Sequence, residues 1–159
     1  MILSKTEKTI GIVLASLLLL LTLSGTWYFL SELNVTLLQW AMFNACSPSG
    51  LMYLLCFLLF LRQKKAIWLP VAFLPMYYFG TMGMFTFTWS GANIFAQLSH
   101  ITMTLNILWA LYVLFKTEDY KSFAKGLLWS ILFFVPYIVY VMYYCRTHAE
   151  ELNRLLQMN

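Results

Sequence analysis

The amino-acid sequence predicts an all-α protein, a single domain over residues 1–159 built as a polytopic bundle of five transmembrane helices. Two observations lead to this fold class. Hydrophobic residues make up 62% of the chain and charged residues only 10%, with a mean hydropathy of +0.75, whereas an ordinary soluble domain is about 25% charged. Between Lys65 and Lys116 the chain contains no Asp, Glu, Lys or Arg, and this stretch is long enough for two helices of about 20 residues to cross a bilayer.

Five apolar runs define the predicted helices. Each is long enough to cross a hydrocarbon core of about 30 Å as an α-helix, and in order they cover residues 10–30, 37–61, 67–89, 92–115 and 123–145. The third and fourth runs are separated only by a short cluster of small, turn-forming residues at 90–93. This cluster predicts a tight connection between the two helices.

Lysine and arginine residues give the expected orientation in the membrane. Eight of the ten basic residues lie before the first run, after the second or after the fourth: Lys5, Lys8, Arg62, Lys64, Lys65, Lys116, Lys121 and Lys125. Because basic loops resist translocation, the N-terminus is predicted to lie in the cytoplasm, and five crossings then put the C-terminus on the opposite side. The net charge of +4 belongs to these loop ends, which favours membrane lipids as partners and argues against nucleic acid.

The residues that commonly hold metals or cofactors are too few and too scattered for such a site. Cys46, Cys56 and Cys145 form no CxxC pair. A b-type haem would need two imidazoles on facing helices, and the second histidine, His148, lies in the C-terminal tail. No metal and no cofactor are therefore predicted.

The fourth predicted helix carries an ordered stripe of polar side chains. Asn93, Gln97, His100 and Thr104 follow one another at spacings of four, three and four residues, which places them on one face. Polar side chains in hydrocarbon are costly unless they face a neighbouring helix or a cavity, so this face is predicted to turn inward. His100 has two interpretations: a neutral imidazole that bonds a neighbouring helix, or a general base in a site.

The second helix has a polar patch near its middle, centred on Asn44, Ser47 and Pro48. As structure, the patch is typical of a proline kink, because Pro48 removes a backbone donor and nearby serines can satisfy the freed carbonyls. As chemistry, Ser47 would be a nucleophile activated by His100 from a facing helix, the minimal pair that acyl transfer requires. This second interpretation needs the two side chains within about 3 Å of each other.

Similar stripes occur on the third and fifth helices, which contain Thr81 and Tyr137 among aromatic and small residues at helical spacings. Such stripes are typical of packing seams. If a cavity exists between the helices, its aromatic lining would suit an acyl chain or another flat apolar ligand. The residues predicted to contact such a ligand are Asn44, Thr81, Asn93, Gln97, Thr104 and Tyr137.

The segment from Asn93 to Tyr144 resembles a known family. It has a histidine early in a helix, an apolar stretch ending near Phe115, a short basic loop and two blocks, Gly126-Leu127-Leu128-Trp129 and Val135-Pro136-Tyr137-Ile138-Val139-Tyr140. In this arrangement the chain is similar to the androgen-induced-protein family of integral-membrane hydrolases and its bacterial relatives. The resemblance implies hydrolysis of fatty acid esters of hydroxy fatty acids by a helix-two hydroxyl and a helix-four histidine. By position these are Ser47, where the family has threonine, and His100. The family usually has six helices, one more than predicted here.

Two functions from different classes follow. In a lipid-ester hydrolase, Ser47 attacks an acyl carbonyl and His100 accepts its proton, while Asn44, Gln97 or Thr104 orients the imidazole or stabilises the oxyanion. In a non-enzymatic membrane subunit, the polar residues join helices, and the protein serves the assembly of a larger complex or binds or transports a lipid or small apolar ligand. The five runs contain no acid to orient the histidine, which counts against strong catalysis.

Overall fold

The computed structural model describes residues 3–86, 89, 91 and 93–157, and these residues form an all-α bundle, as predicted. Its elements are α1 (Lys5–Trp27), η1 (Tyr28–Glu32), α2 (Leu37–Phe43), α3 (Cys46–Gln63), η2 (Ala66–Ala72), α4 (Phe73–Phe79), η3 (Thr81–Gly83), α5 (Asn93–Lys116), α6 (Tyr120–Thr147) and α7 (Ala149–Gln157). The element η1 is a π-helical turn that continues α1, whereas η2 and η3 are 3-10 helices.

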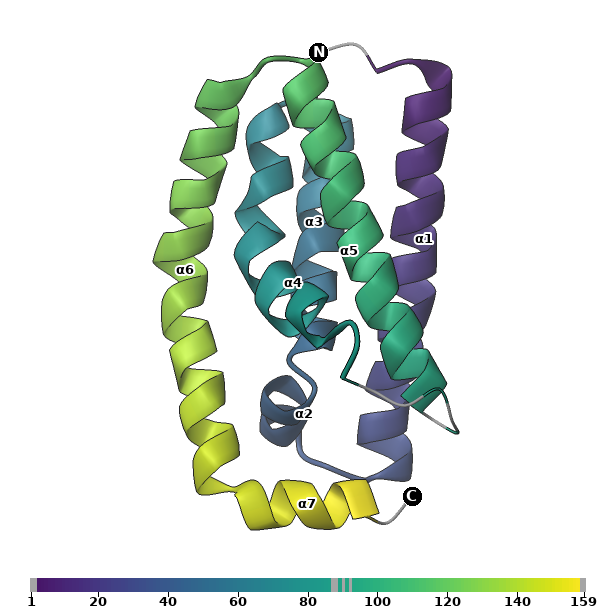
Figure 1. Cartoon of the computed structure of the whole chain (residues 1–159), viewed down its shortest axis with the longest axis vertical. Coiled ribbons are helices and arrows are strands. Elements are labelled where there is room, and N and C mark those ends of the chain that lie inside the picture. The colour runs from purple at the N-terminus through teal and green to yellow at the C-terminus, as the bar shows by residue number, and fades with distance from the viewer. Residues whose placement is uncertain (1–2, 87–88, 90, 92, 158–159) are drawn as a thin grey trace.

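Within the described residues, four helices are long and apolar enough to cross a membrane: Lys5–Glu32, Cys46–Gln63, Asn93–Lys116 and Tyr120–Thr147. They correspond to the first, second, fourth and fifth predicted runs. In Figure 1, α1 and α6 lie on opposite sides of the bundle with α3, α4 and α5 between them. The two termini lie at opposite ends, and α7 lies across the end that is away from the N-terminus (Figure 1).

Side-chain caps determine where the first two helices begin. The Ser4 hydroxyl accepts a hydrogen bond from the backbone N–H of Glu7, whose carboxylate accepts one from the Ser4 N–H, which is a capping box. Thr36 and Gln39 make the same exchange at the start of α2. Because these caps satisfy N–H groups that no helical carbonyl reaches, α1 begins at Lys5, before the predicted apolar run.

The predicted helix over residues 37–61 is two helices in the structure. The first, α2, ends at Phe43, and Asn44 has a non-helical φ of −120° and ψ of 48° before α3 begins. Pro48 explains the break, because a proline ring clashes with the carbonyl four residues earlier, here that of Asn44, and proline has no N–H to donate. The proline therefore interrupts this helix, where the sequence indicated a kink.

The predicted helix over residues 67–89 is also interrupted. Because Pro70 and Pro75 lie in its first half, the chain forms η2, α4 and η3 in place of one continuous α-helix. At about 2.0 Å per residue in 3-10 turns and 1.5 Å in α-helical turns, the rises of residues 66–83 sum to roughly 30 Å if laid along one axis. Among the described residues before α5, the last helical one is Gly83; residues 87 and 88 of the predicted helix and 90 and 92 of the predicted turn lie outside the described residues.

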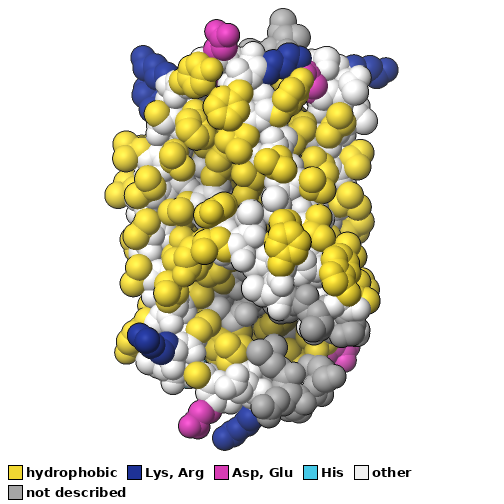
Figure 2. Space-filling view, in the orientation of Figure 1, with side chains coloured by type: hydrophobic (Ala, Val, Ile, Leu, Met, Phe, Trp, Pro, Cys, Tyr) yellow, Lys and Arg dark blue, Asp and Glu magenta, His cyan; other side chains and the backbone are white. Residues whose placement is uncertain are grey.

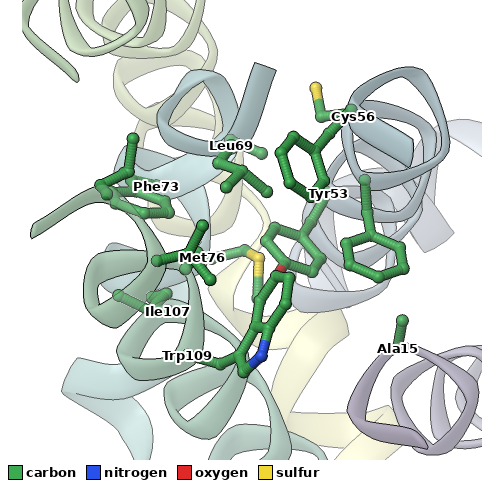
Figure 3. Packing of buried hydrophobic residues seen from close by; sticks show 14 of the residues in the cluster. Ala15, Tyr53, Cys56, Leu69, Phe73, Met76, Ile107 and Trp109 are labelled. Carbon is green, nitrogen blue, oxygen red and sulfur yellow. The ribbon is translucent and has the colours of Figure 1, made fainter. Parts of the chain in front are cut away.

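The apolar core joins α1, α3, η2, α4 and α5. Tyr53 of α3 and Trp109 of α5 lie near its centre, beside Leu69 and Met76 (Figure 3). The ring of Phe57 meets that of Trp109 edge-on, with centroids 5.5 Å apart, a favoured aromatic geometry. On its outer surface the bundle is covered with hydrophobic side chains along its middle, while lysine and arginine gather mainly at one end (Figure 2).

Candidate functional site

The polar stripe of α5 turns inward, as its spacing predicts. Gln97 and His100 are only 1% and 5% exposed. Thr104 is half-buried, whereas Asn93 is exposed at the first residue of the helix. Two hydrogen bonds join this face of α5 to η3, one made by His100 and one by Thr104.

His100 contacts the backbone of η3 at Gly83. The imidazole Nδ1 lies 2.9 Å from the Gly83 carbonyl oxygen, and because a carbonyl only accepts, Nδ1 must carry the proton. A Cβ placed on Gly83 would lie 2.8 Å from the imidazole Cε1, so only glycine leaves room for this approach. The imidazole is thus oriented by a backbone carbonyl.

Thr104 provides the second contact between α5 and η3. Its hydroxyl lies 3.1 Å from the Thr81 hydroxyl and 2.9 Å from the carbonyl oxygen of His100, one turn earlier in its own helix. Thr81 and Thr104, both predicted as ligand-contacting residues, therefore bond to each other. Interhelical hydrogen bonds of this kind contribute about 0.6 kcal/mol on average in membrane proteins.

Ser47 belongs to a different contact, between α3 and α1. The Asn44 side-chain amide donates to the Ser47 hydroxyl at 2.9 Å, and the Cys46 thiol donates to the Asn44 side-chain carbonyl at 2.9 Å. A Cβ placed on Gly25 of α1 would lie 3.3 Å from the Ser47 Oγ. The small residue at Gly25 thus allows α1 to lie directly on the serine and asparagine pair.

The predicted pair of nucleophile and base is not assembled in this arrangement. Ser47 bonds to Asn44 and packs on α1, whereas His100 bonds to η3. No hydrogen bond joins Ser47 to His100 among the residues that the structure describes. The arrangement therefore lacks the direct proton transfer that acyl transfer by this pair requires.

Tyr137 lies in a third contact, between α6, α2 and α4. Its hydroxyl donates to the Ala41 carbonyl oxygen at 3.0 Å, and its ring meets that of Phe79 edge-on at 5.8 Å. Buried residues Met42, Ala45 and Val141 surround this contact. The residues predicted to surround one ligand therefore divide among three contacts: α5 with η3, α3 with α1, and α6 with α2.

The polar stripe predicted on the fourth helix did not include Asn106, which is the most completely buried polar residue of α5. Its side-chain amide donates to the Leu14 carbonyl oxygen of α1 at 3.1 Å and to that of Thr102 at 2.9 Å, while the Tyr53 hydroxyl of α3 donates to its backbone carbonyl at 3.3 Å. Three helices therefore meet at this residue. An amide in the middle of an apolar span was a sufficient signal to find it, because such a group needs an internal partner.

Helix α5 contains two buried amide oxygens that are open acceptors, and the described residues contain no group of metal ligands. The side-chain oxygens of Gln97 and Asn106 have no hydrogen-bond partner among the described residues, and each would gain from a water or another donor. No three His, Cys, Asp or Glu residues in the described part of the chain are placed to hold a metal ion. No family model, curated protein or solved structure matches the chain.

Proposed function

We propose that this chain is a non-catalytic integral membrane protein, a subunit that binds a membrane lipid, a small apolar ligand or a partner membrane protein. One observation carries the proposal: Ser47 and His100, the residues best suited to catalysis, bond to separate elements and not to each other. Without a hydrogen bond between them, the Ser47 hydroxyl cannot pass its proton to the His100 imidazole, which is the step that acyl transfer by this pair requires.

The hydrogen bonds of the buried polar groups support the same conclusion. His100 bonds to Gly83, Thr104 to Thr81, Asn106 to Leu14 and Tyr137 to Ala41, and each bond joins two different elements. In hydrocarbon there is no water to compete for these groups. We therefore assign them the role of holding the helices in register.

The outer faces of α1 and α6 are the surfaces that a ligand or partner would meet. On α6 the rings of Trp129 and Phe133 stack with centroids 5.5 Å apart, and both are exposed. Tyr140 and Tyr143 lie further along the same helix, also exposed. Exposed aromatic rings of this kind suit acyl chains and apolar helices.

We also propose that the end carrying the N-terminus lies in the cytoplasm. Lys5 and Lys8 lie in the first turn of α1, and Lys64 and Lys65 lie between α3 and η2. Basic connections of this kind are retained on the cytoplasmic side during insertion. The C-terminus then lies on the opposite side of the membrane.

The test is to replace each candidate residue and a matched control. Ser47→Ala is compared with Ser49→Ala, whose hydroxyl bonds only within its own helix, to the Ala45 carbonyl. His100→Ala is compared with His148→Ala, the other histidine of the chain. Each purified variant is assayed for hydrolysis of fatty acid esters and for unfolding by sodium dodecyl sulfate.

We expect no ester hydrolysis by any form of the protein. Unfolding of Ser47→Ala and His100→Ala should occur at lower detergent concentration than that of the controls, because each loses a contact between elements. The proposal fails if the unsubstituted protein hydrolyses esters and both variants lose turnover while unfolding normally. That result would establish a serine and histidine hydrolase in place of a structural role.

A further inference from the structure

Charge is divided unequally between the two ends of the bundle. The end that carries the N-terminus has eight of the ten basic residues and three of the six acidic ones, a net charge of +5. The opposite end has Arg146 and Arg154 with Glu32, Glu150 and Glu151, a net charge of −1. The apolar surface between them separates these two charged ends (Figure 2).

Seven of the eight basic residues at the N-terminal end have no carboxylate partner among the described residues. Lys116 is the exception, because its ammonium pairs with the Glu7 carboxylate. The other seven, all exposed, form the basic rim: Lys5, Lys8, Arg62, Lys64, Lys65, Lys121 and Lys125. Nearby Asp119 is already engaged, since its carboxylate caps the start of α6 by accepting from the Ser122 N–H.

Two cations of the rim lie at one contact between elements. A Cβ placed on Gly126 of α6 would lie 2.5 Å from the Ile67 carbonyl oxygen and 2.4 Å from Pro70, so α6 and η2 lie backbone against backbone here. Lys125 immediately precedes Gly126, and Lys65 lies two residues before Ile67. Lys65 and Lys125 therefore both lie next to the α6 and η2 contact in the chain.

The rim lies where the apolar spans end. The Trp68 indole N–H donates to the Gln63 side chain at 3.1 Å, and the Tyr120 ring is 57% exposed at the start of α6. Tryptophan and tyrosine typically lie at the level of the lipid headgroups, and lysine side chains extend from there toward the polar region. Cations at this depth meet phosphate groups of lipids before any soluble partner.

We propose that the basic rim binds the headgroups of anionic phospholipids, with Lys65 and Lys125 as the centre of the site. Unpaired ammonium groups and phosphate are complementary in charge, and each lysine near a membrane surface adds to the attraction. This site concerns the headgroup region, away from the intramembrane contacts, and is independent of whether the protein is an enzyme.

The test measures lipid retained by the purified full-length protein. The protein is equilibrated with mixed phosphatidylglycerol and phosphatidylcholine in detergent, and bound lipid is counted by native mass spectrometry. The double variant Lys65→Gln with Lys125→Gln is compared with Arg146→Gln with Arg154→Gln, which removes the same charge from the opposite end. A second rim variant, Lys64→Gln with Lys121→Gln, serves if the first does not fold.

We expect the unsubstituted protein to bind phosphatidylglycerol in preference to phosphatidylcholine. In the rim variant the ratio of the two bound lipids should fall by at least about fivefold. The variant at the opposite end should retain it. Equal losses in the two variants would mean that only net charge matters, and no preference for phosphatidylglycerol would overturn the site. Competition by millimolar inorganic phosphate would also overturn it, because the site would then recognise a free anion.

Discussion

The contact between Gly11 and Trp109 leaves no space for a side chain between α1 and α5. A Cβ placed on Gly11 would lie 2.3 Å from the Trp109 ring. The ring cannot move aside freely, because its N–H donates to the Glu7 carbonyl oxygen at 3.1 Å and it also meets the Phe57 ring edge-on. Gly11→Ala should therefore destabilise the protein by about 1–3 kcal/mol through overpacking.

Gly25→Ala is the matched comparison, since Gly25 lies on the same helix. The nearest atom to its added Cβ would be 3.3 Å away, a tight contact that small shifts relieve. Alanine also favours the helix over glycine, so this variant should be close to neutral. Unfolding in sodium dodecyl sulfate measures the stability of both variants. Equal midpoint concentrations for Gly11→Ala and Gly25→Ala would contradict the tight packing at Trp109.

The inward face of α5 could be predicted from the spacing of its polar residues, but their partners could not. Gln97 and His100 are buried as expected. The partner of His100 is a backbone carbonyl, that of Gly83, and a carbonyl is present at every residue, so the sequence carries no mark of which one is used. The sequence suggested Ser47 as the partner of His100 only because a hydroxyl is chemically distinctive. In the structure the rotation of α3 turns Ser47 toward α1 instead.

The lengths of the long helices could be predicted because each apolar run must satisfy its own backbone in hydrocarbon. The run at 92–115 matches α5 within one residue at each end, whereas 123–145 lies within the longer α6. The sequence signal fails where proline lies in a run, since hydropathy does not register a missing N–H. Whether a proline interrupts its helix also depends on its position. Pro136 lies within a continuous α6, whereas Pro48 follows a break between two helices.

Pro48→Ala should join α2 to α3. Alanine restores the N–H that can bond to the Asn44 carbonyl and removes the ring that clashes with it, so a helix can continue through residues 44 and 45. Cα chemical shifts of Asn44 and Ala45 measured by nuclear magnetic resonance should move toward helical values. Pro136→Ala is the control, because α6 is already continuous there; unchanged shifts in Pro48→Ala would mean that the Asn44 and Ser47 bond holds the break.

At its basic end the bundle is joined by polar contacts between helices that are far apart in the sequence. The Glu7 carboxylate of α1 accepts from the Tyr112 hydroxyl at 2.8 Å and pairs with the Lys116 ammonium, both on α5. At the opposite end the Gln39 amide of α2 donates to the Glu151 carboxylate of α7 at 2.6 Å. Polar contacts thus join elements at both ends of the bundle, where water is near, in addition to the apolar packing and buried hydrogen bonds of its middle.

The number of crossings decides how the whole molecule lies in the membrane, and residues 66–83 decide that number. If η2, α4 and η3 cross as the fifth segment, the termini lie on opposite sides; if they do not, four helices place both termini on the same side. We expect opposite sides, because the summed rise of these helical turns, laid along one axis, is roughly the thickness of the hydrocarbon core. Fusions of green fluorescent protein and alkaline phosphatase at each terminus, expressed in bacteria, measure this directly. Fluorescence should appear only from the N-terminal fusion and phosphatase activity only from the C-terminal one, whereas the same reporter active at both ends would remove residues 66–83 from the set of crossings.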